Sequence, residues 1–140
     1  MKAAVIDASV VAAAFFPETH TEVAQTLLAS GCRLHSPELI FPEVANVIWK
    51  RHSRGEIDRT DAAALLSDVM GLPLEITPSE QLVHPALELA MRTGRTVYDC
   101  LYVALAVQTK TVMLSNDRRL VNALSSGPLK NHVAWLGQSR

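Results

Sequence analysis

The chain has 140 residues and a mass of 15.3 kDa, which fits a single domain spanning residues 1–140. Apolar residues make up 49% of the sequence and charged residues 19%, a composition that excludes disordered and collagen-like proteins. The 13 basic and 14 acidic residues give a net charge of −1, so the excess of positive charge expected of a nucleic-acid-binding protein is absent.

The sequence lacks the features of membrane and secreted proteins. The apolar stretch at the N-terminus contains Asp7 at its centre, which is unlike a signal peptide. The apolar run Val97–Val107 is too short to span a bilayer and contains Asp99. Cys32 and Cys100 do not have the spacing of a redox or zinc motif, so we interpret them as buried thiols in a reducing compartment. We therefore expect a cytoplasmic protein with no membrane partner.

Short β-rich runs alternate along the chain with longer segments of helical period. The predicted strands are Lys2–Ile6, Arg33–Ser36, Leu74–Thr77, Thr111–Leu114 and Val133–Leu136. Between them, apolar stripes at helical spacing occur in residues 23–28, 44–48, 62–69 and 83–90. Strands separated by helices pair in parallel through right-handed crossovers. We therefore predict a three-layer α/β fold, with helices on both faces of a parallel sheet of about five strands.

Two acidic residues come directly after predicted strands, at the edge of the sheet where α/β proteins bind ligands. Asp7 follows the first strand, and Asp117 follows the fourth strand after Ser115 and Asn116. Each carboxylate is equally well explained as a helix N-cap, so both interpretations stay open. Because parallel strands end at the same edge, we expect the two side chains to point into one crevice.

Two further acids lie in predicted helices. Asp99 is in an apolar run that we expect to be buried, where a lone carboxylate needs a cation or another partner. Thr96 offers an alternative, because the two residues have the spacing of a capping box. Glu43 follows Pro42 near a helix start, where the helix dipole alone would explain an acid. The four carboxylates together would repel one another unless a divalent cation lay between them, and Mg²⁺ and Mn²⁺ prefer such oxygen ligands.

The order of these motifs resembles the PIN-domain ribonucleases and, more narrowly, the VapC toxins of bacterial toxin–antitoxin pairs. The segments that carry the resemblance are Asp7-x-Ser9, Glu43 at the start of a mid-chain helix, Val97-Tyr98-Asp99, and Ser115-Asn116-Asp117-Arg118-Arg119-Leu120. The resemblance covers essentially the whole chain. It implies a PIN-like α/β/α fold with a metal site at the carboxyl edge of the sheet.

The resemblance also implies an activity, namely endonucleolytic cleavage of RNA phosphodiester bonds with Mg²⁺ or Mn²⁺ as cofactor. The residues implied to bind the metal and carry catalysis are Asp7, Glu43, Asp99 and Asp117. The small polar residues implied to support the site are Ser9, Ser115 and Asn116. We expect arginines beside these acids to position the RNA, and the candidates are Arg92, Arg95, Arg118 and Arg119.

The resemblance to VapC toxins implies that the protein inhibits translation and growth. It also implies a homodimer and a VapB-like antitoxin that covers the acidic site. The chain offers apolar residues as contact surface near its N-terminal helices, namely Phe15, Phe16, Ile40, Phe41, Ile48 and Trp49.

We interpret the basic residues 50–54 as a solvated helix end. The histidines do not have metal-ligand spacing. Without the four site acids, ten acidic residues face 13 basic ones, so the charge balance is compatible with RNA binding.

Two other function classes stay open. The chain also resembles the haloacid dehalogenase-like phosphatases, which place an aspartate after the first strand. That family has an Asp-x-Asp motif there, whereas this chain has Ser9 in place of the second aspartate, so the general acid would be missing. A non-catalytic interaction module, in which the acids only cap helices, belongs to a different class. Metal binding at the acids distinguishes the nuclease from the module.

Overall fold

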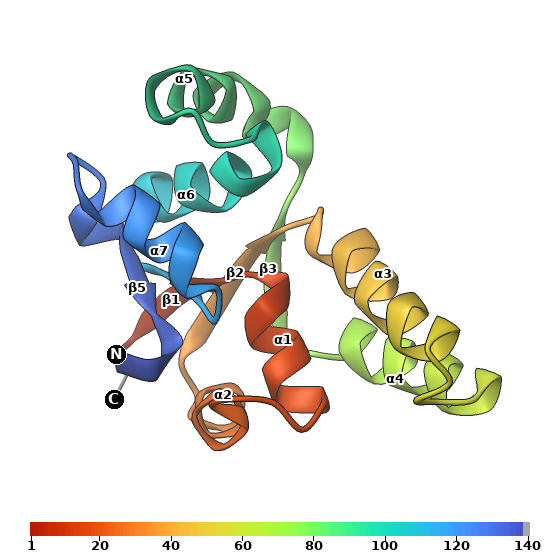
Figure 1. The fold of residues 1–140 in the computed structure, drawn as a ribbon. Helices are drawn as coiled ribbons and strands as arrows, with labels where there is room; N and C mark the ends of the chain where they lie inside the picture. Colours follow the sequence, from red (N-terminus) through yellow and green to blue (C-terminus); the bar gives the residue numbers. More distant parts are fainter. Residues whose placement is uncertain (139–140) are drawn as a thin grey trace.

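The computed structural model describes residues 1–138, in which a central parallel sheet is flanked by helices (Figure 1). The strand order is β3-β2-β1-β4-β5, and every neighbouring pair is parallel. The strands are β1 (Ala3–Ile6), β2 (Arg33–Pro37), β3 (Leu74–Thr77), β4 (Met113–Ser115) and β5 (Val133–Trp135). All five predicted strands are confirmed, and their ends differ from the prediction by at most two residues.

The part of the chain that the structure describes contains seven α-helices, which complete a three-layer α/β fold. They are α1 (Ala8–Phe15), α2 (Thr21–Ala29), α3 (Ile40–Ser53), α4 (Arg59–Met70), α5 (Val83–Thr93), α6 (Val97–Thr109) and α7 (Arg118–Ser125). Helices α1 to α4 lie on one side of the sheet and α5 to α7 on the other (Figure 1). The predicted fold class is therefore confirmed.

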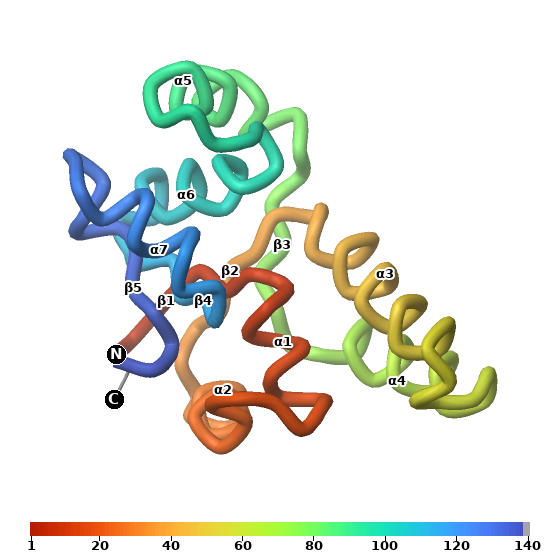
Figure 2. The backbone as a smooth tube through the Cα atoms, viewed as in Figure 1, coloured from red at the N-terminus to blue at the C-terminus, as the bar shows by residue number. Residues whose placement is uncertain are grey.

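The chain reverses its direction across the sheet between β1 and β4, which lie side by side at the centre (Figure 2). Ile6 at the end of β1 pairs with Leu114 near the end of β4, so the two strands end at the same edge. In open α/β sheets, this point of reversal is where ligands bind. Asp7 and Asp117 follow these two strands and lie at that edge.

Helix α6 packs against β1, β2 and α5, which explains why its sequence is apolar on nearly every side. Residues 100–106 are buried, but the first turn is not: Tyr98 is 64% exposed and the side chain of Asp99 is 32% exposed. The expectation that Asp99 is deeply buried is therefore wrong. The sheet and α5 cover the middle of α6, while its first turn keeps contact with solvent.

The apolar residues expected to form surplus contact surface mostly belong to the hydrophobic core. Phe16, Ile40 and Ile48 are buried, and Phe15 and Phe41 are partly buried against the core. Only one member of this set is largely exposed, the Trp49 side chain on α3. The helical period indicates which residues share a face of a helix. It does not show that α1 and α3 pack against each other.

The two cysteines are both free thiols but differ in burial. Cys100 is buried in α6, whereas Cys32 is only half-buried before β2, so the expectation of two buried thiols is wrong for Cys32. None of the helices formed by residues 1–138 has the length and apolar character needed to cross a membrane.

Candidate active site

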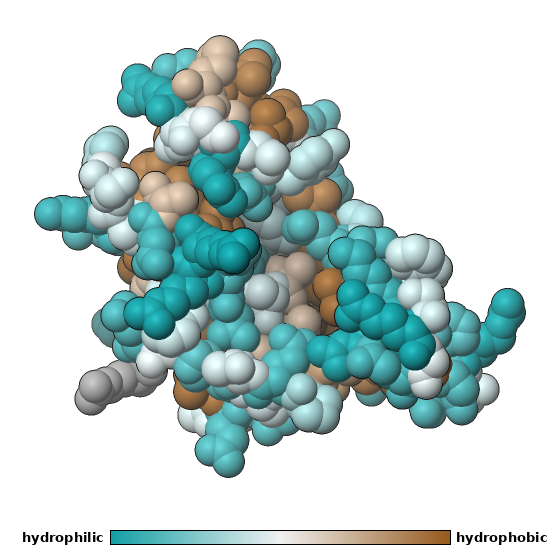
Figure 3. All heavy atoms as spheres, viewed as in Figure 1, coloured by the Kyte–Doolittle hydropathy of each residue, from teal (hydrophilic) through white to brown (hydrophobic). Residues whose placement is uncertain are grey.

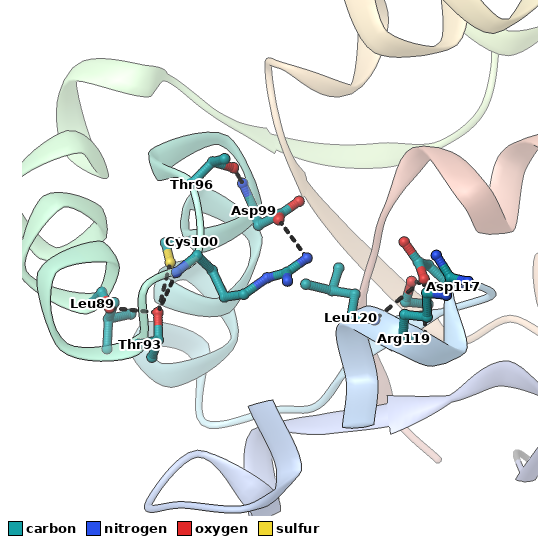
Figure 4. Close-up of polar contacts among 10 residues, drawn as sticks. Leu89, Thr93, Thr96, Asp99, Cys100, Asp117, Arg119 and Leu120 are labelled. Atoms are coloured by element: carbon teal, nitrogen blue, oxygen red, sulfur yellow. Dashed lines mark hydrogen bonds and ion pairs between the residues drawn. The ribbon is translucent and has the colours of Figure 1, made fainter. Parts of the chain in front are cut away.

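Asp7 and Asp117 each cap the helix that follows their strand. Oδ1 of Asp7 accepts the backbone N–H groups of Ser9 at 3.0 Å and Val10 at 3.3 Å, at the start of α1. Oδ1 of Asp117 accepts two backbone N–H groups of α7, at 3.1 and 3.2 Å (Figure 4). The N-cap interpretation is confirmed for both residues. Because each cap uses Oδ1, the same carboxylate can still offer Oδ2 to another ligand.

Hydrogen bonds among serine hydroxyl groups join the ends of β1 and β4. The Ser9 hydroxyl donates to Oδ1 of Asp7 and accepts the backbone N–H of Asn116 at 2.7 Å. The Ser115 hydroxyl lies 3.2 Å from that of Ser9 and accepts the backbone N–H of Asp117 at 3.0 Å. Two acids that are distant in the sequence are therefore fixed relative to each other by the three predicted supporting residues.

Asp7 is a buried carboxylate with a perturbed pKa. Burial raises its pKa to about 6. The hydroxyl groups of Ser115 and Ser9 and the backbone N–H of Val10 act in the opposite direction, and the negative charge of Glu43 raises the pKa further. The effect of burial on the pKa is larger than that of the hydrogen bonds. The ionised form of Asp7 is therefore less stable in the folded protein than in water.

Glu43 on α3 and Tyr102 on α6 form a pair across the same edge of the sheet. The Tyr102 hydroxyl donates to Oε1 of Glu43 at 2.5 Å. Burial raises the pKa of Glu43, the bond from Tyr102 lowers it, and the charge of Asp99 raises it. Burial together with the negative charges of Glu43, Asp7 and Asp99 raises the pKa of the Tyr102 hydroxyl. Three of the four predicted acids therefore lie around this one phenol.

Asp99 lies in the exposed first turn of α6 and has a basic partner. Its Oδ2 lies 3.4 Å from Nη2 of Arg95, and its backbone N–H donates to the Thr96 hydroxyl at 3.1 Å, so half of the predicted capping box is formed. Both charged side chains are about one third exposed, and such an ion pair contributes little to stability. Figure 4 shows Asp99 and Asp117 at the beginnings of α6 and α7.

The donor set at this edge matches the ligands of Mg²⁺ and Mn²⁺, because every candidate is a carboxylate oxygen. Burial is the main cause of the raised pKa values of Asp7 and Glu43, and neighbouring negative charge adds to it: Glu43 raises the pKa of Asp7, and Asp99 raises that of Glu43. A cation between these carboxylates would offset both effects. No three acidic, histidine or cysteine side chains among residues 1–138 already converge closely enough to hold an ion. The helix caps, the Tyr102 hydroxyl and Arg95 hold the carboxylates instead.

A sequence model of the PIN domain family matches residues 4–123, a range that contains all four acids. The chain belongs to the PIN domain family. It is 35% identical over 118 residues to Ribonuclease VapC3 from Pyrobaculum aerophilum, an alignment that covers 83% of this chain and 90% of the relative. The resemblance inferred from the motifs is therefore confirmed at the level of the family.

Solved structures share the PIN domain fold of this chain. The crystal structure of PAE2754 from Pyrobaculum aerophilum has a TM-score of 0.71 at 20% identity, covering 98% of this chain and 85% of the other. A toxin-antitoxin complex from Klebsiella pneumoniae has a TM-score of 0.60 at 15% identity, with coverage of 94% and 95%. VapBC2 from Rickettsia felis, bound to a DNA fragment from their promoter, has a TM-score of 0.62 at 12% identity, with coverage of 95% and 98%.

The four arginines predicted to contact RNA have different surroundings in this PIN domain. Arg92 and Arg95 each pair with an acid four residues away on or beside their helix. The guanidinium of Arg118 lies over the Trp135 ring, 4.5 Å from its centroid, whereas the Arg119 side chain is exposed. Figure 3 shows hydrophilic side chains gathered over α7 and α3, with less hydrophilic surface between these helices.

Two features of the PIN domain site were missed from the sequence. The apolar pattern indicates only that Tyr102 belongs to a buried helix. The available signal is its spacing, because a residue three positions after Asp99 lies on the same face of α6. The contact between His20 and Trp135, whose ring centroids are 4.8 Å apart, had no sequence signal because neither residue belongs to a motif.

Proposed function

We propose that this PIN domain protein is an Mg²⁺- or Mn²⁺-dependent endoribonuclease that acts in the cytoplasm as the toxin of a VapBC-type toxin–antitoxin pair. The observation that carries the proposal is the group of carboxylates around Tyr102, in which Glu43, Asp7 and Asp99 all raise the pKa of the phenol. Such a group favours a divalent cation bound through oxygen. The relative at 35% identity is a ribonuclease by name, which supports the same activity here.

In the proposed site, one or two metal ions would be held by Asp7, Asp99 and Asp117. Glu43 would contribute directly or through water. A bound metal lowers the pKa of a water molecule and stabilises charge on the phosphodiester oxygens. Ser9 and Ser115 hold Asp7 and Asp117 in register through their hydroxyl groups. The Tyr102 hydroxyl fixes one oxygen of Glu43. Arg95 pairs with Asp99 at 3.4 Å and partly offsets its negative charge.

We also propose partners for the protein. The Klebsiella pneumoniae structure is a toxin-antitoxin complex and the Rickettsia felis structure is VapBC2, which supports a VapB-like antitoxin for this chain. We also propose that the chain forms a homodimer. RNA cleavage would account for inhibition of translation and growth. RNA contacts are proposed for Arg92, Arg95, Arg118 and Arg119.

A non-catalytic interaction module is the second candidate, because the capping roles of Asp7 and Asp117 account for both residues without chemistry. The two candidates differ in metal binding. A cation bound only by the folded protein raises its melting temperature. The nuclease is expected to be stabilised by Mn²⁺, and the module is not.

The proposed function is tested by incubating the purified chain with a mixture of structured and single-stranded RNAs in the presence of Mn²⁺. Asp7→Asn and Asp99→Asn are each expected to lower cleavage by about a hundredfold or more, because each removes a charged metal ligand. Asp68→Asn is the matched control, since Asp68 is an exposed acid on α4 and its loss should leave cleavage unchanged.

Far-ultraviolet circular dichroism of each variant establishes that the fold is retained. The wild-type protein should lose cleavage in excess EDTA and regain it with Mn²⁺. Undiminished cleavage by Asp99→Asn, or in EDTA, would exclude the proposed mechanism. A wild-type melting temperature that does not respond to Mn²⁺, together with no cleavage of any RNA, would favour the interaction module.

A further inference from the structure

A polar hollow lies beside the acidic site, on the side where β5 ends. Its volume is about 480 Å³ and its lining comes from the α1–α2 loop, α3, α7 and β5. The lining residues that matter here are Glu18, His20, Arg51, Asn116, Arg118 and Trp135. They bring two arginines, two aromatic rings and one amide into a space with a single carboxylate. This composition favours a ligand that is both anionic and aromatic.

The aromatic rings hold the cationic groups of the hollow in fixed places. Arg118 lies over the Trp135 ring at 4.5 Å, and the His20 ring meets Trp135 edge-on with centroids 4.8 Å apart. Arg51 lies 4.3 Å from the centroid of the Phe16 ring and pairs with Glu18 at 2.8 Å. Arginine and aromatic faces of this kind recognise unpaired nucleotides through stacking and through contacts to phosphate.

The hollow is joined to the acidic site by a continuous chain of hydrogen bonds. Nδ1 of His20 donates to Oδ1 of Asn116 at 3.0 Å, and the amide nitrogen of Asn116 donates to the backbone carbonyl of Thr19 at 2.9 Å. The backbone N–H of Asn116 donates to the Ser9 hydroxyl, which in turn donates to Asp7. The hollow therefore adjoins the acidic site, since Asn116 lines it and directly precedes Asp117.

The backbone around the hollow is specialised to seat the two rings. His20 has a left-handed backbone conformation, with φ of 69°, which is uncommon for a residue other than glycine. A Cβ atom on Gly137 would lie 2.8 Å from the His20 ring and 2.8 Å from the Trp135 ring. The rings occupy the space that any larger residue at position 137 would need.

We propose that this hollow is a nucleotide-binding subsite, which takes one unpaired nucleotide of the RNA substrate next to the phosphate that is cleaved. Arg118 contacts the phosphate of that nucleotide, and the base lies against Trp135 and His20. The subsite deepens the proposed nuclease function and rests on it. It assigns roles to His20 and Trp135, for which the sequence offered no interpretation.

The test uses the fluorescence of Trp135. The chain has two tryptophans, and Trp49→Phe removes the exposed one and leaves Trp135 as the only reporter. A short single-stranded oligoribonucleotide is titrated in EDTA, so that binding is measured without cleavage. We expect saturable quenching, and Arg118→Gln in the same background is expected to weaken binding about tenfold through loss of a charge-assisted contact.

Arg59→Gln is the matched control, because it removes the same charge from an exposed residue of α4, a helix that does not line the hollow. Its effect should stay below about threefold, as expected for long-range charge alone. Gly137→Ala is a second test: it should displace the two rings and weaken binding, with the melting temperature measured to confirm folding. A glutamate-rich peptide of equal length should not quench Trp135.

Equal weakening of RNA binding by Arg118→Gln and Arg59→Gln, or RNA binding detected by anisotropy with unchanged Trp135 fluorescence, would overturn the subsite. Quenching by the acidic peptide as strong as that by RNA would overturn it in favour of a protein partner. Failure of the proposed function looks different. In that case the wild-type protein binds RNA at Trp135 but cleaves none with Mn²⁺, whereas failure of the subsite leaves cleavage intact in Arg118→Gln.

Discussion

The hydrogen bond between Tyr102 and Glu43 connects the hydrophobic core to the candidate site within one pair of side chains. Tyr102 is 3% exposed in α6, and its hydroxyl reaches the half-buried Glu43 of α3. The bond lowers the pKa of Glu43 against the effects of burial and of Asp99. The bond from Tyr102 thus favours the ionised form of Glu43, and it links α3 to α6 at the sheet edge.

Tyr102→Phe removes this donor and leaves a half-buried carboxylate with one fewer partner. We expect the free energy of unfolding to fall by about 1–2 kcal/mol at neutral pH, measured by urea denaturation. Tyr98→Phe removes the same hydroxyl from an exposed position on the same helix and should change stability by less than about 0.5 kcal/mol. Equal effects of the two variants would mean that the bond to Glu43 contributes nothing.

Single residues also show the limit of sequence reasoning. Asp7 and Asp117 were located from their places after strands, since strand ends are readable from local patterns. The surroundings of Asp99 were predicted incorrectly, because an apolar run does not reveal which turn of a helix extends past its packing partners. His20 and Trp135 meet only through the tertiary fold, and neither the period nor a motif connects them.

At the scale of elements, helix ends decide where the chain can turn. Helix α6 ends at Lys110, which has a left-handed backbone with φ of 56°, and its N–H bonds to carbonyls of the last turn. A left-handed conformation is strained for a residue with a side chain and relaxed for glycine. The sequence pattern indicates the helix itself, but it does not show that a lysine adopts the left-handed conformation at its end.

Lys110→Gly is expected to stabilise the protein by about 1 kcal/mol, because glycine adopts the left-handed conformation without strain. Gln108→Gly, two residues earlier in the helical part of α6, should destabilise it by about 1 kcal/mol. Thermal unfolding of the two variants and the wild type measures both signs. A loss of stability in Lys110→Gly would show that the lysine side chain contributes more at this helix end than the strain costs.

At the scale of the whole molecule, the topology was predictable, because strands that alternate with helices have few arrangements compatible with right-handed crossovers. The topology also brings acidic side chains together at the carboxyl edge of the sheet. Burial of the ionised Asp7 carboxylate there lowers the free energy of unfolding. Asp7 binds its proton more tightly in the folded protein than in the unfolded chain, since its pKa rises from 3.8 to about 6. Without metal, folding stability is therefore lost as the pH rises between these two values.

Asp7→Asn keeps a helix N-cap at the start of α1 but removes the buried charge. In EDTA at pH 8, we expect it to raise the free energy of unfolding by up to about 3 kcal/mol. The difference from the wild type should disappear toward pH 4, where Asp7 is protonated in the folded protein. Urea unfolding across this pH range measures it. A variant less stable than the wild type at pH 8 would show that burial is not the dominant influence on Asp7.

The central pairing of β1 with β4 has a consequence for how the protein is made. Asp7 is synthesised well before β4 and Asp117, because the other sheet neighbour of β1, β2, and the third strand β3 all lie between them in the sequence. Until then β1 has an unpaired edge and the set of acids is incomplete. A nascent or prematurely terminated chain that lacks β4 and Asp117 therefore cannot assemble the proposed metal site.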